Sequence, residues 1–241
     1  MSGRRNRVQK NVYRANRRKL YLSIYLLLCV LPLTGCGLSN TASINDMKNV
    51  EQRGYATILV VSAGEEGKQY HFDLGIAKEK RAGEDSQTEE VCSFNCNSFE
   101  ELNEAYQMVK GKDLSLAHLK VILIENPETV IGQKAENGKL LYDMDGNEEI
   151  AKTCPVLQLS DKEEFLEYLG DAKTPIGTYL SGLIETAQRQ GKDIPWLKDY
   201  LKAVREGAGL LTYELEQVSE GWTLKCCNEI KGNLEIQNTV E

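Results

Sequence analysis

Histidine is scarce in this sequence: the 241 residues include only two, His71 and His118. Zinc sites are built mainly from cysteine and histidine ligands at short, regular spacings, and the spacings here provide no such set. The sequence also contains no GxSxG elbow, no glycine-rich phosphate loop and no HExxH motif. Paired acidic residues at 100–101 and 163–164 fall in the first turns of expected helices, where the helix dipole accounts for them. These absences predict a protein with no catalytic site, no metal and no cofactor.

Long apolar runs are missing after residue 36, so no later segment is expected to cross a bilayer. Of the 29 basic residues, eight precede residue 36, which leaves 21 basic against 36 acidic residues and a formal net charge of −15. Such acidity argues against nucleic acid, or an anionic membrane surface, as a main partner. The 206 residues from 36 onward are enough for one large or two small domains.

The N-terminus, in contrast, has a distinct pattern. A basic segment leads into a mostly apolar run over residues 20–35, which is typical of an export signal. The run ends in Leu33-Thr34-Gly35-Cys36, the pattern of a bacterial lipobox. We expect residues 1–35 to be a cleaved signal peptide, Cys36 to carry a diacylglycerol and an amine-linked acyl chain such as palmitate, and residues 36–48 to be a tether. Two or three acyl chains anchor a protein stably; the alternative is an uncleaved signal anchor.

Five further cysteines, an odd number, follow the predicted lipid site: Cys92, Cys96, Cys154, Cys226 and Cys227. An exported chain permits disulfides, yet an odd count leaves at least one free thiol or an intermolecular bridge. The CxxxC spacing of Cys92 and Cys96 matches neither a zinc knuckle nor a redox CxxC motif. A structural or incidental role is the expectation.

Hydrophobic periodicity in the first half predicts strands over residues 55–62, 69–77, 91–96 and 118–124. In the second strand Tyr70, Phe72, Leu74 and Ile76 share one face, and His71 is expected to be solvated on the other. Residues 78–90 are expected to form a loop. A capping box beginning at Ser98 predicts a helix over 98–110, with its apolar stripe listed here: Phe99, Leu102, Ala105, Tyr106 and Val109.

The second half predicts helices from Gly138, from a capping box at Ser160 through Leu169, over 175–190, and from Ile194. Residues 153–159 should form a strand, and residues 210–230 a β-hairpin. An acidic stretch from Asp143 partly fits an EF-hand, but its glycine and twelfth-position glutamate are missing, so calcium is not favoured. We predict an α+β fold with mixed, largely antiparallel sheets and packed amphipathic helices. Its expected domains are 49–135 and 136–241, the second ending in the hairpin.

The order of these segments resembles a known family. The lipobox, the tether and residues 49–78, with Glu51, Arg53 and Tyr55 in the lead, are similar to the C-subunit lipoproteins of spore germinant receptors (GerC type). Residues 99–110 and the histidine–leucine–lysine–valine segment at 116–122 fit the same pattern, and residues 178–184 and 196–204 extend it. The chain departs from the family at Gly37, where tryptophan is usual, and at 62–65. It is expected to be a shortened or divergent member without the usual C-terminal region.

The resemblance implies a non-catalytic subunit on the outer face of the spore inner membrane in a spore-forming Gram-positive bacterium. Its implied partners are integral membrane A- and B-type receptor subunits, with which it would couple nutrient sensing to germination. The matching motif residues are Arg53, His118 and Lys120; the last two are expected on a core strand and hence to be structural. One alternative is a generic cell-surface lipoprotein that binds a small solute or assists envelope assembly, and another is a secreted hydrolase with an unfamiliar site.

Overall fold

The structure, a computed structural model, describes residues 52–65, 67–78, 88–127, 138–219 and 221–227. The predicted signal peptide, lipobox, lipid site Cys36 and tether lie outside these residues, as does most of the predicted loop at 78–90. The expected domain boundary at 135/136 also lies outside them. Strands from both sides of that boundary are hydrogen-bonded in one sheet.

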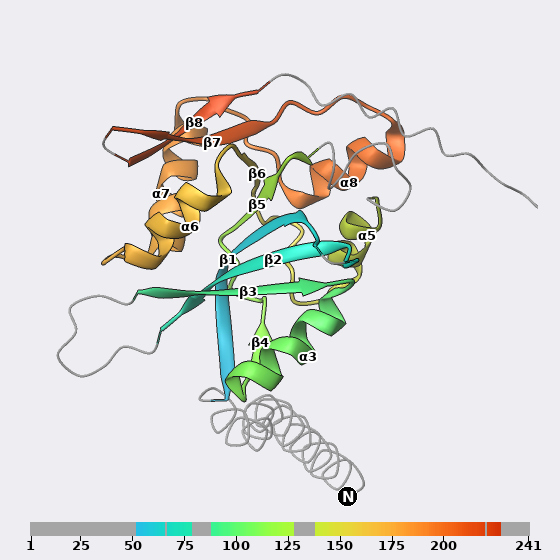
Figure 1. Cartoon of the computed structure of the whole chain (residues 1–241). Coiled ribbons are helices and arrows are strands. Elements are labelled where there is room, and N and C mark those ends of the chain that lie inside the picture. Colours follow the sequence, from blue (N-terminus) through green and yellow to red (C-terminus); the bar gives the residue numbers. More distant parts are fainter. Residues whose placement is uncertain (1–51, 66, 79–87, 128–137, 220, 228–241) are drawn as a thin grey trace, which may run out of the picture. The chain divides into compact units, whose positions relative to one another are not determined.

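The sheet has eight strands in the order β3-β2-β1-β5-β6-β7-β8, with β4 paired to β1 beside this path (Figure 1). In chain order they are β1 Arg53–Ala63, β2 Tyr70–Ala77, β3 Glu89–Cys96, β4 Asp113–Ser115, β5 Val121–Glu125, β6 Val156–Leu159, β7 Tyr213–Val218 and β8 Gly221–Cys226. The predicted α+β class with a mixed sheet is confirmed. Antiparallel pairing is confined to β1–β2–β3 and β7–β8, and the centre, β1–β5–β6–β7, is parallel.

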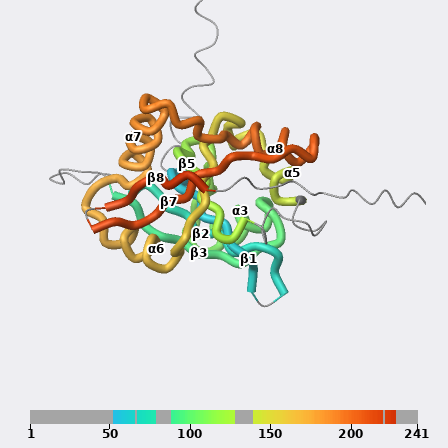
Figure 2. The backbone as a smooth tube through the Cα atoms, turned by 90° about the horizontal axis from the view of Figure 1, so that it is seen from above, coloured from blue at the N-terminus to red at the C-terminus, as the bar shows by residue number. Residues whose placement is uncertain are grey.

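Helices cover both faces of the sheet. One hydrophobic core lies under α3 (Phe99–Lys110), α5 (Gly138–Gly146) and α8 (Leu197–Glu206). The other lies under α6 (Lys162–Asp171) and α7 (Ile176–Arg189). Figure 2 shows α7 and α6 apart from α5 and α8 when the molecule is seen from above. The sheet is therefore the middle of three layers.

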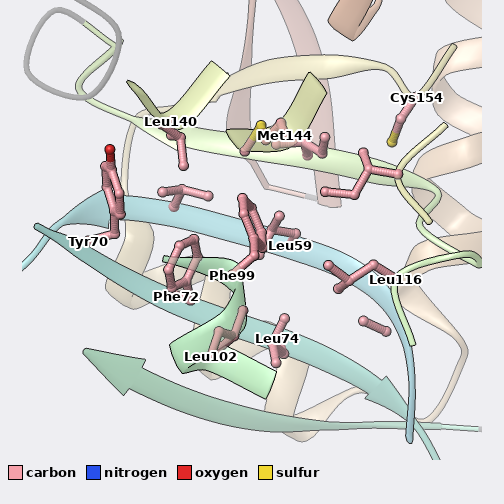
Figure 3. Close-up of a cluster of buried hydrophobic side chains, with 14 of the residues drawn as sticks. Leu59, Tyr70, Phe72, Leu74, Phe99, Leu102, Leu116, Leu140, Met144 and Cys154 are labelled. Atoms are coloured by element: carbon pink, nitrogen blue, oxygen red, sulfur yellow. The ribbon is translucent and has the colours of Figure 1, made fainter. Parts of the chain in front are cut away.

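Strand β2 shows why the sequence pattern works here. Its alternating residues Tyr70, Phe72 and Leu74 point into the first core, where Phe72 stacks against Phe99 of α3 with ring centroids 5.1 Å apart (Figure 3). Leu102, one turn further along α3, is fully buried in the same core. The predicted strand face is confirmed. The predicted start of the helix is also confirmed, because the Ser98 hydroxyl accepts a hydrogen bond from the Glu101 backbone at 3.2 Å.

Several predicted boundaries are wrong for identifiable reasons. Helix α6 is capped by Asp161, whose side chain accepts from the Glu164 backbone at 2.9 Å, because the Ser160 hydroxyl donates to Leu215 instead. Helix α8 begins at Leu197 and not at Ile194, because Pro195 accepts a backbone bond from Val156 at 3.0 Å in a strand-like segment. Similarly, the strand predicted from residue 118 begins at 121.

One residue assigned to an apolar stripe, Val109, points outward and is 68% exposed. The acidic residues of the calcium hypothesis, Asp143 and Asp145, lie inside helix α5 and not in a loop. In the part of the chain that the structure describes, no helix is both long and apolar enough to cross a membrane.

Candidate functional site

The three predicted motif residues lie along the first half of β1. We call the part of the sheet where β1 and β4 begin the entry edge; the described chain enters it at Gln52. Arg53 is the first residue of β1, in register with Asp113 of β4, and it is exposed. His118 and Lys120 are exposed in the segment between β4 and β5. Parallel pairing sets the start of β4 beside Arg53, whereas β5 begins beside Ile58. His118 and Lys120 therefore lie further along β1, next to Tyr55 and Thr57.

The prediction that His118 and Lys120 sit on a core strand is wrong. His118 lies in a turn that is closed by a backbone hydrogen bond from Leu119 to Leu116 at 3.2 Å. Its ring packs edge-on against Tyr55, with centroids 5.0 Å apart. The Lys120 backbone donates to Thr57 at 2.8 Å, while its side chain is left at the surface. The His118 ring thus packs the turn against β1. The side chains of His118 and Lys120 both remain exposed and can contact a partner.

Helix α3 ends at the same edge, because Tyr106 packs over Gly54. A Cβ atom on Gly54 would lie 1.9 Å from the Tyr106 hydroxyl oxygen. Gln107 then donates to the Asp113 carboxylate at 3.1 Å, and Gly111 closes the helix in a left-handed conformation. The last turn of α3 therefore projects beside the start of β1.

A second group of polar side chains lies where β1 and β5 end. We call it the Asp73 cluster; it comprises Ser62, His71, Asp73, Asn95, Glu125 and Lys162. Asp73 is 1% exposed and accepts from His71 Nε2 at 3.1 Å. The Lys162 ammonium, at the start of α6, donates to the Ser62 hydroxyl at 3.1 Å and lies 3.9 Å from both the Asp73 and the Glu125 carboxylates. The cluster joins four strands, β1, β2, β3 and β5, to helix α6, and Asp73 is the most deeply buried of its members.

The hydrogen bonds of His71 determine what this cluster does chemically. Asn95 Oδ1 accepts from the Glu65 backbone N–H at 3.4 Å, so the same oxygen faces His71 Nδ1 at 2.8 Å. Nε2 faces the Asp73 carboxylate at 3.1 Å, so both ring nitrogens have a partner. The Ser62 hydroxyl is bound by Lys162 and not by the histidine. Ser62, His71 and Asp73 are the residue types of a catalytic triad, but they do not have its hydrogen-bond geometry. The cluster instead holds the start of α6 on the sheet through the charge of Lys162.

The sequence prediction of a solvated His71 is therefore wrong, and the Asp73 cluster was missed. Lys162 and Ser62 are 100 residues apart in the chain, so no local spacing reports their contact. One signal was present: Asp73 interrupts an otherwise apolar strand, and a buried carboxylate requires partners.

One of the acidic residues tested for calcium, Asp145, is held by basic side chains. The Asp145 carboxylate contacts Lys152 Nζ and Arg205, each at 2.9 Å. The hydrogen bond from Lys152, followed by the charge of Arg205, holds the pKa of Asp145 below its ordinary value. Within the described ranges, no group of three histidine, cysteine or acidic side chains is placed to hold a metal ion.

Comparison with protein families agrees with the resemblance found in the sequence. The family model described as the spore germination protein N-terminal domain matches residues 46–212, which is more than half of the chain. The chain belongs to this family, which confirms its predicted relation to the germinant receptor C-subunits and indicates a role in spore germination. Searches of curated proteins and of solved structures found no match. The match spans β1 to the end of the segment before β7, and so includes both the entry edge and the Asp73 cluster.

Proposed function

We propose that this protein is the lipid-anchored, non-catalytic subunit of a spore nutrient-germinant receptor. The family match over residues 46–212 carries the proposal, and the lipobox at Leu33-Thr34-Gly35-Cys36 supplies the anchor. In this role the protein sits on the outer face of the spore inner membrane, held by lipid on Cys36. It binds integral membrane A- and B-type subunits and is required for the assembly or signalling of the receptor.

The geometry of the described residues supports a binding role more than a chemical one. His71 uses both ring nitrogens in structural hydrogen bonds, and His118 is placed at the surface against Tyr55. The exposed motif residues Arg53 and Lys120 present charge to the outside. Coupling then works through contacts: a ligand that favours one state of the complex shifts the population of that state.

Co-purification from detergent-solubilised spore membranes tests the receptor assignment. The full chain carries a C-terminal tag, and mass spectrometry identifies what is captured with it. Recovery of two polytopic subunits in comparable amounts is the expected result. Recovery of the lipoprotein alone would contradict the proposal and favour a generic surface lipoprotein that binds a small solute or assists envelope assembly.

The anchor has a separate test. Cys36→Ala removes the thiol that carries the diacylglycerol, so we expect unprocessed precursor to accumulate with its signal intact. A matched control is Cys226→Ala, because this exposed thiol lies far from the lipobox in the sequence and should leave processing unchanged. The intact mass of each variant decides the matter, and a cleaved, acylated Cys36→Ala product would refute Cys36 as the site.

A further inference from the structure

The entry edge combines exposed apolar and basic side chains, and this combination needs an explanation. Met108 and Val109 are 86% and 68% exposed in the last turn of α3. They are the two most exposed large apolar side chains among the described residues. Arg53 is exposed at the same edge, since Tyr106 packs over Gly54 and so holds this turn beside the start of β1. Lys110 lies next to Val109 but is paired with Glu90 at 3.2 Å.

We infer that the entry edge rests on the bilayer surface, with Met108 and Val109 entering the interface and Arg53 against anionic lipid headgroups. The inference rests on the membrane tether of the proposed function. The chain between Cys36 and the first described residue, Gln52, is residues 37–51, which extend to about 50 Å at most and average about 20 Å if flexible. The tether thus delivers this edge, before any other, to the membrane.

Charge does not oppose this contact. The net charge of −15 after residue 35 repels an anionic surface at long range, but interactions are screened beyond about 8 Å at physiological salt. Within that distance the local groups decide. The acidic side chain in register with Arg53 is Asp113, which accepts a hydrogen bond from Gln107, and Glu90 is neutralised by Lys110. Because the tether makes docking intramolecular, a surface of modest affinity is sufficient.

Tryptophan quenching by brominated phosphatidylcholine tests the contact on the lipidated full-length product reconstituted in vesicles. Met108→Trp places the probe at the entry edge. Val218→Trp is the matched control, because Val218 is 44% exposed at the end of β7, the opposite edge of the parallel strands. The quenching of each variant is measured relative to the parent, which contains Trp196 and Trp222. In vesicles with about 30% phosphatidylglycerol we expect quenching at position 108 and not at 218.

The charge contribution is measured in the same vesicles. Replacing Arg53 by Gln should lower the ratio of docked to undocked protein about fivefold. Lys202→Gln on α8, also exposed, should leave it unchanged. Quenching at position 108 should also fall at about 0.5 M salt.

Equal quenching at 108 and 218, or none at 108, would overturn the inference and would assign the entry edge to a protein partner. The vesicles contain no receptor subunits, so this failure is distinct from a failure of co-purification. Release of the protein from the vesicles would instead refute the tether of the proposed function.

Discussion

The carboxylate of Glu89, on β3, lies 3.0 Å from the backbone nitrogen of Gly177 in the first turn of α7. Its second oxygen accepts from the Ile176 backbone at 2.7 Å, and its first also accepts from the Thr57 hydroxyl at 3.1 Å. Pro175, the residue at the N-cap of α7, provides no side-chain cap. A glutamate 87 residues earlier therefore caps the helix, and its negative charge faces the positive end of the helix dipole.

Replacement of Glu89 by Ala should destabilise the protein by about 2–4 kcal/mol, because three buried donors lose a charged acceptor. Glu89→Gln should cost less, since one oxygen acceptor remains. Urea unfolding measures both free energies. Glu163→Gln, in the exposed first turn of α6, is the control and should change stability by less than about 0.5 kcal/mol. Equal effects of the two glutamine variants would contradict the capping role.

Gly54 should tolerate no side chain. A Cβ atom there would lie 1.9 Å from the Tyr106 hydroxyl and 2.5 Å from the ring carbon that bears it, so Gly54→Ala forces α3 away from β1. We expect a loss of more than about 2 kcal/mol and a lower melting temperature. Gly182→Ala is the matched control, because nothing lies within 4 Å of its Cβ position in the middle of α7. That variant should gain about 0.5–1 kcal/mol from helix propensity.

How far the sequence predicts this structure depends on the range of each interaction. The faces of β2 and the Ser98 cap of α3 follow from residues two to four positions apart, and both are confirmed. The parallel centre of the sheet does not follow, because strand order is set by crossovers that no local pattern records. The exposure of Val109 was missed because its helical spacing continues past the point where α3 leaves the core.

The predictability of the candidate sites also depends on the sequence range of their interactions. Arg53, His118 and Lys120 were found by resemblance to a family motif, and the structure places them along the first half of β1. Their exposure was not predicted, since the turn at 117–118 lies within a run that reads as continuous strand. The Asp73 cluster depends on contacts between β1, β2, β5 and α6, which only the folded chain brings together.

Stability should depend on pH through Glu101. Its hydrogen bond to Lys68, and then the backbone N–H of Asn97 at 2.8 Å, lower the pKa of the carboxyl below its ordinary value of 4.5. A carboxylate with a depressed pKa contributes its stability above the unfolded-state pKa, and loses it as the pH falls through the folded-state pKa. Glu101→Gln should therefore be less stable than the parent at neutral pH, and the difference should vanish in acid. Urea titrations across that range measure it, and a constant difference, or one shared by the exposed Glu104→Gln, would contradict the assignment.

The thiols should differ sharply in reactivity. Burial raises the pKa of Cys154 to about 12, and Cys92 and Cys96 are also buried with raised pKa values, so these three should resist alkylation in the native protein. Cys226 is exposed and should react first. Cys92 and Cys96 lie four residues apart on β3, about 13 Å along a strand, which is too far for a disulfide. Mass spectrometry after alkylation, with and without urea, tests both points, and rapid native labelling of Cys154 would contradict them.

Asp73 should be the most sensitive member of its cluster. Asp73→Ala removes the buried carboxylate that the His71 ring and the Lys162 ammonium share, and breaking a buried ion pair costs about 3–5 kcal/mol. Glu125→Ala removes the other carboxylate near Lys162, but this one is 27% exposed, so water replaces it and the cost should stay below about 1 kcal/mol. Urea unfolding at neutral pH ranks the two variants. If the two variants lose the same free energy of unfolding, Asp73 is not what holds Lys162 in place. The packing of α6 on the sheet would then depend on its apolar residues Phe165 and Leu169.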